Sequence, residues 1–347
     1  MLPGPDQGTV KVLGLSLRKR RYLRGFLPGR RLQAVRSIGD LRPGDTVAVW
    51  ASNPIRHAVE ALPEVTVLRV EDGFLRSVGL GAQLTQPLSW VVDPVGIYYD
   101  PAGPSGLEIL LQTARFDPAQ IARARELRRR IVEARLSKYN VGSSQWPGLS
   151  RSRAPGQPVV LAVGQVESDA SVRSGAAGIT TNIGLLRAAR AAHPDAWLVY
   201  KPHPDVVAGL RRAGANEDAA STMCDEIASQ APIEQLLDLV DAVHVMTSLT
   251  GFEALLRGKK VHCHGLPFYA GWGLTRDSVT TSRRSRRLTL DELCAGALIA
   301  YPSYVDRATG QPCSAEEAVQ SLVDWRRRDD GGLRWWHRLL KPVLRHV

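Results

Sequence analysis

The stretch PVVLAVGQVESDASVRSG, residues 158–175, joins a short apolar run directly to a charged loop. The run consists almost entirely of β-branched and aliphatic residues, which predicts a strand buried on both faces. The loop contains Gln165, Glu167, Asp169 and Arg173, whereas glycine, serine and asparagine would suffice for an ordinary turn. Charge held this close to the end of a buried strand indicates a binding or catalytic role for the loop.

Strands that alternate with helices extend this pattern in both directions. Strands are predicted at residues 46–50, 65–70, 90–92 and 96–99 in the first half, and at 158–163, 197–200, 242–246 and 260–262 in the second. Helices are predicted at residues 55–62, 118–136, 179–192, 205–213, 232–239 and 251–257. A Gly-, Ser- and Pro-rich segment at 142–158 is typical of a linker. The alternation predicts an α/β protein with one parallel sheet in each half and a cleft between the halves.

The composition favours anionic partners. The 347 residues suit two domains, and the 44% of hydrophobic residues suffices for large cores. Lys+Arg 45 against Asp+Glu 34 leaves a net charge of +11, which suits phosphorylated or carboxylated substrates, an anionic membrane face or nucleic acid. Because no nucleic-acid recognition motif accompanies the charge, we expect no nucleic-acid partner.

Cysteine and histidine usage predicts neither disulfides nor a metal site. Cys224, Cys263, Cys294 and Cys313 are widely spaced without a C-x-x-C pair, so reduced thiols are expected. The His262-Cys263-His264 triplet could supply metal ligands, but without further clustered ligands nearby a strand end is the favoured interpretation. The N-terminus lacks the order of a signal peptide, and no apolar run approaches the length that spans a bilayer. We therefore expect a cytoplasmic protein without cofactor or metal.

Three more loops with polar or charged side chains follow predicted strands. They contain Lys201 and His203 among prolines, then Ser248, Thr250 and Glu253 at a helix start, and in the first half Glu71, Asp72 and Arg76. Ligands of parallel sheets bind at the carboxyl ends of the strands, where all four loops lie. They are therefore candidates for one shared site.

The loops of the second half admit functional and purely structural interpretations. Hydroxyls of Ser248 and Thr250 at a helix start suit a phosphate, whereas simple N-capping explains one of them without a ligand. Glu253, in the first turn of this helix, could either compensate the helix dipole or accept hydrogen bonds from the hydroxyls of a ribose. Lys201 and His203 either direct two cations at a phosphate or belong to a proline-framed turn.

Asp169 has the most specific interpretation. A carboxylate beside a phosphate-binding edge is electrostatically unfavourable unless it attacks or polarises the substrate. Carboxylate nucleophiles carry out glycosyl transfer with retention through a covalent intermediate. In this hypothesis Arg173 orients Asp169 or neutralises an acidic sugar, and Glu71 or Asp72 is the base for the acceptor hydroxyl. The alternative for the acidic pair is a turn held by Arg76.

Five segments together resemble the capsule polysaccharide biosynthesis family, whose characterised members include retaining β-Kdo glycosyltransferases. They are EDGFLRSVGLG at 71–81, LSKYNVG at 136–142, GQVESDASVR at 164–173, KPHPD at 201–205 and TSLTGFEALLRGKKVHCHGLPFYAGWGLT at 247–275. The resemblance implies a GT-B-like pair of Rossmann-type domains and a CMP-activated donor. It also implies similarity to bacterial sialyltransferases, which use an acidic-acidic-Gly motif and an HP motif.

The resemblance also implies roles for single residues. Asp169 becomes the nucleophile of the Q-x-x-x-D-x-x-x-R match, which begins at Gln165 and ends at Arg173, and His203 becomes a ligand of the CMP phosphate. Ser248, Thr250 and Glu253 are placed at the nucleotide. The expected division is an acceptor-side domain at 1–150, a CMP-sugar-binding domain at 151–310 and a basic helical tail at 311–347. Capsule enzymes of this type often carry two transferase modules, and this sequence has one.

The partners expected are thus CMP-Kdo and a glycan or glycolipid acceptor. A tail with Trp325-Arg326-Arg327-Arg328 and with tryptophans, leucines and cations at 333–341 suits the inner face of the cytoplasmic membrane. The alternative is that the tail packs back across the domains. Rival functions are transfer from another CMP- or UDP-sugar and, in a different class, polyanion binding without catalysis.

Overall fold

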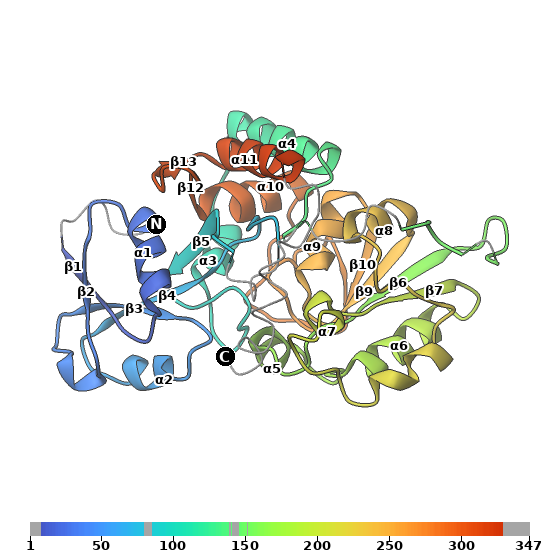
Figure 1. The fold of residues 1–347 in the computed structure, drawn as a ribbon, viewed down its shortest axis with the longest axis horizontal. Helices are drawn as coiled ribbons and strands as arrows, with labels where there is room; N and C mark the ends of the chain where they lie inside the picture. Colours follow the sequence, from blue (N-terminus) through green and yellow to red (C-terminus); the bar gives the residue numbers. More distant parts are fainter. Residues whose placement is uncertain (1–7, 80–84, 139, 141–145, 151, 329–347) are drawn as a thin grey trace.

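The chain forms two β-sheets that lie side by side, as the computed structural model shows for residues 8–79, 85–138, 140, 146–150 and 152–328 (Figure 1). The first sheet has seven strands in the order β13-β12-β5-β4-β3-β1-β2. The second has six strands in the order β11-β10-β9-β6-β7-β8, and all neighbouring pairs in it are parallel. The expected fold, a GT-B-like pair of Rossmann-type domains, is confirmed.

The first sheet is mixed. Its strands are β1 (Thr9–Val12), β2 (Arg31–Ala34), β3 (Thr46–Trp50), β4 (Thr66–Asp72), β5 (Ser89–Asp93), β12 (Ser303–Val305) and β13 (Pro312–Cys313). Strands β2, β1, β3 and β4 run parallel, whereas β5 is antiparallel to β4 and β12 is antiparallel to β5. The prediction of a wholly parallel first sheet is therefore wrong, because β5 returns antiparallel to β4 and the described residues between them, 73–79 and 85–88, form no helix.

The strands of the second sheet are close to the predicted ones. They are β6 (Val159–Val163), β7 (Trp197–Lys201), β8 (Glu226–Ile227), β9 (Ala242–Val245), β10 (Lys260–Cys263) and β11 (Arg276–Asp277). Every residue of β6 is buried, as its continuous apolar run predicts. The charged loop of residues 164–169 therefore begins where this central strand ends.

Helices cover both faces of each sheet. In the first half, α1 (Leu17–Phe26) packs on one face through Leu23 and Phe26, and α2 (Ile55–Glu60) packs on the other through Val59. In the second half, α6 (Asn182–Ala192) covers one face, and α8 (Ile233–Leu239) and α9 (Leu249–Leu256) cover the other. The shorter helical segments are η1 (Ile38–Asp40), α5 (Ala170–Gly175), α7 (Pro204–Val207) and η3 (Glu217–Thr222).

A third group of helices joins the two halves. It consists of α3 (Gly106–Thr113), α4 (Pro118–Glu133), α10 (Leu290–Cys294), η4 (Ala295–Ala300) and α11 (Ala315–Arg328). Helices α4, α10 and α11 lie together above the sheets (Figure 1). The start of α4 is as predicted, because Asp117 caps it and Pro118 occupies its first turn.

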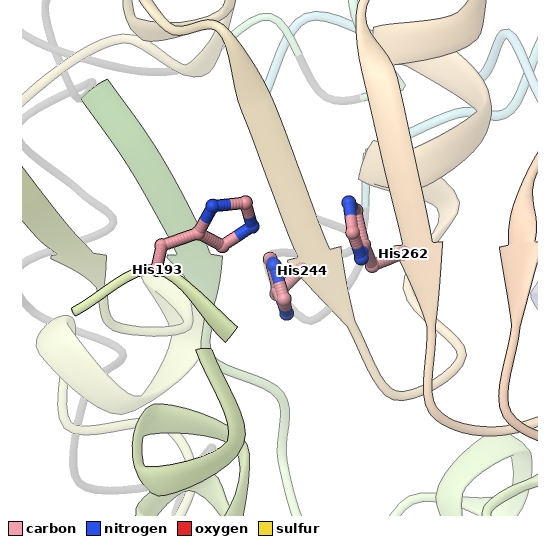
Figure 2. A group of neighbouring side chains, drawn as sticks. All are labelled: His193, His244 and His262. Carbon is pink, nitrogen blue, oxygen red and sulfur yellow. The ribbon is translucent and has the colours of Figure 1, made fainter. Parts of the chain in front are cut away.

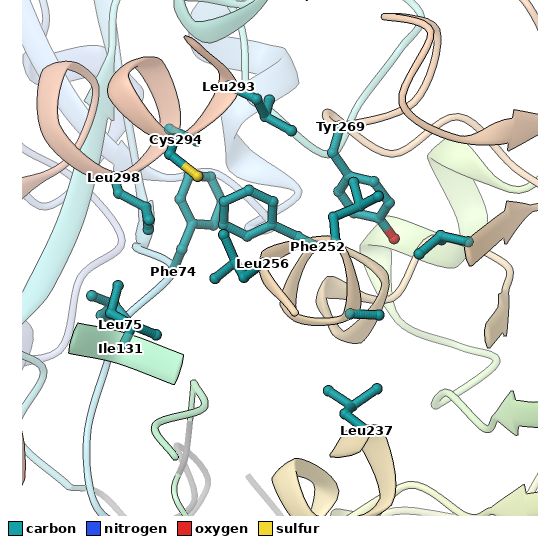
Figure 3. Packing of buried hydrophobic residues seen from close by; sticks show 14 of the residues in the cluster. Phe74, Leu75, Ile131, Leu237, Phe252, Leu256, Tyr269, Leu293, Cys294 and Leu298 are labelled. Atoms are coloured by element: carbon teal, nitrogen blue, oxygen red, sulfur yellow. The ribbon is translucent and has the colours of Figure 1, made fainter. Parts of the chain in front are cut away.

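One apolar cluster crosses the junction between the halves (Figure 3). Phe74, from the end of the first sheet, stacks on Phe268 of the second half with ring centroids 4.4 Å apart. The buried carboxylate of Glu108 on α3 accepts hydrogen bonds from Arg283 and Arg284, with an Arg284 Nε–Oε2 distance of 2.8 Å. Apolar contact and buried ion pairs thus fix the two sheets relative to each other.

Two predicted elements are wrong for local reasons. Residues 96–99, expected to be a strand, form turns, because the Asp93 carboxylate accepts hydrogen bonds from the amides of Val95 and Gly96 and bends the chain. The helix expected at 205–213 is only the four residues of α7, since Gly209 adopts a φ of 70° and ends it. The elements β1, α1 and β2, which precede the first predicted strand at 46–50, were not predicted.

The end of the described chain returns to the first half. Strands β12 and β13 extend the first sheet, so a division at residue 310 would separate them from each other. In α11, Trp325 is buried beneath the Arg307 guanidinium, 3.9 Å from its ring centroid, and Arg326 donates to Glu234. The tail expected at 333–341 lies outside the described residues. No helix in the described segments has the length and apolar character needed to cross a membrane.

Candidate active site

A cleft of about 960 Å³ lies between the two sheets. Its walls are formed by loops that follow β3, β4, β6, β7 and β9, together with the start of α1. All of the predicted site residues except Arg173 line it: Glu71, Asp72, Arg76, Gln165, Asp169, Lys201, His203, Ser248, Thr250 and Glu253. The structure thus brings together residues from two halves of the chain in one cleft.

Asp169 presents a weakly held carboxylate to this cleft. It occupies the N-cap position of α5, but its side chain makes no capping hydrogen bond and is 53% exposed. Its contacts are long, with Ser171 Oγ at 3.5 Å and an Arg211 guanidinium nitrogen at 4.0 Å. The charge partner at the carboxylate is therefore Arg211, whereas Arg173 is exposed and is not part of the cleft wall. A carboxylate in this state retains lone pairs for a ligand.

The other side chains of the same loop position it. Gln165 is buried, accepts a hydrogen bond from the Thr247 amide (2.8 Å) and donates to Thr247 Oγ1 (3.1 Å). Glu167 accepts from the amides of Asn182 and Ala215, both at 2.8 Å. Gln165 thus ties the loop after β6 to the loop after β9, and Glu167 ties it to α6. Gln165 and Asp169 both line the cleft, but of the two acids and the glutamine only Asp169 has no hydrogen bond shorter than 3.5 Å in the described chain.

His203 and Lys201 supply hydrogen-bond donors after β7. The Nδ1 atom of His203 accepts from the amide of Asp205 at 3.2 Å, so the proton of the neutral ring resides on Nε2. Burial lowers the pKa of His203, which keeps the ring neutral at pH 7. Lys201 donates through Nζ to the Ser229 carbonyl at 2.8 Å, and burial lowers its pKa to about 8. His203 is therefore the donor better placed for a ligand in the cleft.

The start of α9 forms the floor of the second-half wall. Ser248 caps the helix by accepting from the Thr250 amide at 3.2 Å, which is the structural role that capping predicts. Glu253 is buried, and its Oε1 accepts from the Lys138 amide at 2.7 Å. Burial raises the pKa of Glu253 to about 7. The segment at 136–140 is thus bound to α9 through a carboxyl group that also lines the cleft.

The two acids on the opposite wall, Glu71 and Asp72, differ in their hydrogen bonds. Asp72 accepts from Arg76 Nε at 2.7 Å and from Trp90 Nε1 at 3.1 Å, which occupies both carboxylate oxygens. The Oε1 atom of Glu71 accepts a hydrogen bond from the amide of Asp72, at 3.0 Å. Burial and the neighbouring Asp72 charge raise the pKa of Glu71 to about 7. Glu71 therefore has the character of a proton acceptor at neutral pH.

Two residues of this wall were not predicted from the sequence. Lys19 of α1 lies over the Trp50 ring, 3.1 Å from its centroid, and interacts electrostatically with Glu71. The Tyr99 hydroxyl is buried, lines the cleft and finds no hydrogen-bond partner in the described part of the chain. Lys19 belongs to a run of basic residues before residue 45. The sequence of such a run does not indicate which of its side chains faces a binding site.

Comparison with known proteins agrees with the fold and the motifs. A family model described as "Capsule polysaccharide biosynthesis protein" matches residues 45–304. The capsule polysaccharide modification protein LipA of Neisseria meningitidis serogroup A is 45% identical over 325 residues, which cover 91% of this chain and 46% of LipA. The lipopolysaccharide-processing protein LpsZ of Rhizobium meliloti is 44% identical over 280 residues, 79% of this chain and 63% of LpsZ. The chain spans about half the length of LipA.

Two solved structures are similar over nearly the whole chain. Both are KpsC of Thermosulfurimonas dismutans, one titled "beta Kdo 2,7 transferase" and one titled "beta Kdo 2,4 transferase". Each is 35% identical, with TM-scores of 0.75 and 0.78, and the matches cover 92% and 91% of this chain and 99% and 98% of theirs. With a family match over most of its length, this chain belongs to the capsule polysaccharide biosynthesis protein family.

Proposed function

We propose that this chain is a retaining glycosyltransferase that moves Kdo, or a related ulosonic acid, from a CMP-activated donor to a lipid-linked or polysaccharide acceptor. One observation carries the proposal: an exposed, weakly paired carboxylate at Asp169 lines the same cleft as Glu71 on the opposite wall. The similarity to two β-Kdo transferase structures over more than nine-tenths of this chain supports the substrate class.

The second-half wall would bind the donor nucleotide. A CMP-sugar carries a single phosphate, so the charge to be neutralised is modest. His203 Nε2–H, the amides at the start of α9 and the helix dipole offer donors to that phosphate without a metal ion. Glu253 and Thr250 line the same wall, where the ribose of the nucleotide would lie.

In the first step, Asp169 would attack the anomeric carbon of the sugar. A bond forms between a carboxylate oxygen and that carbon, and the bond from the carbon to the phosphate oxygen breaks with its electron pair leaving on CMP. Arg211, 4.0 Å from Asp169, lies where it can hold the carboxylate or the acid group of the sugar. CMP is a weakly basic leaving group, so this step needs no general acid.

In the second step, the acceptor hydroxyl would displace Asp169. The oxygen of the hydroxyl bonds to the anomeric carbon, the bond to Asp169 breaks, and Glu71 takes the hydroxyl proton. Two displacements at one carbon give net retention. A base with a pKa of about 7 suits this role, since it is largely ionised just above neutral pH and still binds a proton well.

The rival functions fit the cleft less well. A polyanion-binding groove would expose cations without acids, whereas the walls of this cleft mix acids such as Glu71, Asp72 and Asp169 with cations such as Lys19 and Arg211. A UDP-sugar would bring a second phosphate, and such donors place more negative charge beside Asp169. A CMP-sugar is therefore the donor that the charge distribution favours.

The test is a transfer assay with product analysis. Purified protein is incubated with CMP-Kdo, another CMP-ulosonic acid or a UDP-sugar, each with lipid-linked glycan acceptors, and products are identified by mass spectrometry. We expect one added ulosonic acid and release of CMP, with the anomeric configuration of the donor retained in NMR spectra of the product. Transfer from the UDP-sugar alone, or an inverted product, would contradict the proposal.

A further inference from the structure

Three histidines converge on the second sheet, away from the cleft. His244 lies on β9, His262 is its register partner on β10, and His193 follows the end of α6 (Figure 2). The rings of His244 and His262 stack with centroids 4.3 Å apart, and His193 meets both edge-on. None of the three lines the cleft.

Their nitrogen atoms lack the partners that buried polar atoms normally have. One ring nitrogen from each histidine lies within 4.8 Å of the other two. The Nε2 atoms of all three are buried without a hydrogen-bond partner in the described chain, and the His244 side chain is fully buried. An unpaired buried polar atom costs about 1–3 kcal/mol. Three such atoms facing one another suggest a ligand that satisfies them together.

We propose that His193, His244 and His262 bind a divalent first-row transition metal ion, with Zn²⁺ the best fit, through their ring nitrogens. Imidazole is a preferred ligand of zinc, and three nitrogens at bonds of about 2.0–2.1 Å leave a fourth tetrahedral position for water or an anion. Nitrogens on such an ion lie about 3.3 Å apart, whereas here they lie within 4.8 Å of one another, so binding requires the stacked His244 and His262 rings to turn until their lone pairs converge.

The surroundings resemble those of a protein metal ligand. The Nδ1 atom of His244 lies 3.0 Å from Nε2 of His264, a contact that fixes the His244 ring and directs its Nε2 at the cluster. Neutral imidazole is the form of histidine that binds metal. Lys260 and Arg276 lie near enough to act on the rings electrostatically, which would favour an anion such as chloride in the fourth position.

The bound ion would act on the fold rather than on sugar transfer. It would join the end of α6 to β9 and β10. Asn182 begins α6 and Thr247 follows β9, and both are partners of Gln165 in the loop of Asp169. Because metal binding to the native state adds to its stability, the ion should raise the melting temperature. This inference stands independently of the proposed transferase activity.

The experiment measures binding of the metal alone. Tag-free protein is stripped with a chelator, and Zn²⁺ binding is followed by calorimetry and elemental analysis, with Co²⁺ absorption reporting the geometry. We expect one ion per chain, intense visible Co²⁺ bands typical of tetrahedral coordination and a higher melting temperature. His193→Ala and His262→Ala should each weaken binding by more than the roughly tenfold typical of losing an outer-shell partner.

His57→Ala is the matched control, because His57 is a 70% exposed histidine on α2 outside the cluster, and it should leave binding unchanged. Circular dichroism shows whether each variant is folded. If a variant fails to fold, the Co²⁺ spectrum of the wild type alone decides between nitrogen ligands in a tetrahedral site and a solvated surface ion. No saturable Zn²⁺ binding, or binding unaffected by both cluster substitutions in folded protein, would overturn the proposal.

Discussion

Arg76 holds Asp72 in place, with its Nε 2.7 Å from the aspartate Oδ2, and so separates the roles of two adjacent acids. The second oxygen of Asp72 is occupied by Trp90. Glu71 retains its capacity to accept a proton, and its pKa is raised to about 7. The acidic turn held by Arg76 and the catalytic base were alternative interpretations of this pair, and the geometry allows each acid to take one of them.

The first prediction concerns Glu71 and pH. A base must be ionised to act, so kcat/KM should rise with pH up to about 7 and then level off. Glu71→Gln should lower kcat by about 10²- to 10⁴-fold and abolish this dependence. Asp72→Asn serves as the comparison, because it should reduce activity through loss of positioning and keep the bend, but shift it to lower pH, since the Asp72 charge that helps raise the pKa of Glu71 is removed. A pH profile in Glu71→Gln that still bends near 7 would assign the base to another residue.

Asp169→Asn tests the nucleophile. An amide cannot form the covalent intermediate, so transfer should fall at least about 10⁴-fold while CMP still binds. Intact-protein mass spectrometry of the wild type with donor alone should show one added sugar, absent from the variant. Arg173→Ala, on the helix α5 that Asp169 precedes, is the control, since Arg173 is exposed and outside the cleft wall. Near-normal turnover by Asp169→Asn would remove this residue from the mechanism.

His203→Ala should weaken CMP binding by about tenfold or more, because it deletes a neutral N–H donor that we place at the phosphate. His57→Ala should leave CMP affinity unchanged.

Calorimetry in the presence of a chelator adds a second comparison. Because the histidine cluster lies away from the cleft, chelation should lower the melting temperature yet preserve CMP affinity. Loss of CMP binding upon chelation would place a metal in the donor site instead.

The sequence predicted the second half of the fold better than the first. A continuous apolar strand such as β6 must be buried on both faces, so its place in the centre of a sheet is predictable. The charged loop then lies at the carboxyl end of that strand. In the first half, the bend after β5 depends on the Asp93 carboxylate, which accepts hydrogen bonds from two nearby amides. A pattern of apolar residues cannot predict such a contact. The histidine cluster was missed for a similar reason, because His193 and His262 become neighbours only when α6 packs on the sheet.

Positions within the site divide in the same way. The motifs predicted which residues lie along the cleft, because strand ends in parallel sheets share one edge. They could not predict which of these side chains hydrogen-bond to other parts of the protein, as Gln165 does to Thr247. Arg211, the partner of Asp169, was also missed. The sequence predicted that it lies within a helix over 205–213, whereas the helix ends before Gly209.

Membrane association is predicted from the basic and aromatic tail after residue 330. Each basic residue near an anionic surface contributes about 1 kcal/mol, so the full chain should bind anionic vesicles and be released by salt. A chain ending at Asp330 keeps α11 and the buried Trp325, and should therefore fold yet bind more weakly. Flotation with anionic and neutral liposomes measures the difference. Equal flotation of the two chains would mean that the tail is not the anchor.

Glu253→Gln should stabilise the protein, and more so at alkaline pH. The folded-state pKa is raised by burial to about 7 from 4.5, so the folded protein binds this proton more tightly than the unfolded chain. The contribution of Glu253 to stability is therefore full below pH 4.5, is lost as the pH rises to 7, and stays lost above it. The loss amounts to at most about 3 kcal/mol.

Glutamine mimics the protonated carboxyl group and keeps an acceptor for the Lys138 amide. Denaturant unfolding of wild type and Glu253→Gln should thus differ by about 2–3 kcal/mol more at pH 8 than at pH 5. Glu133→Gln, at a 59% exposed position on α4, is the matched control and should show no such difference. CMP affinity measured on the same samples reports any separate role at the ribose. A stability change that is the same at both pH values would mean that Glu253 is not the source of the pH dependence.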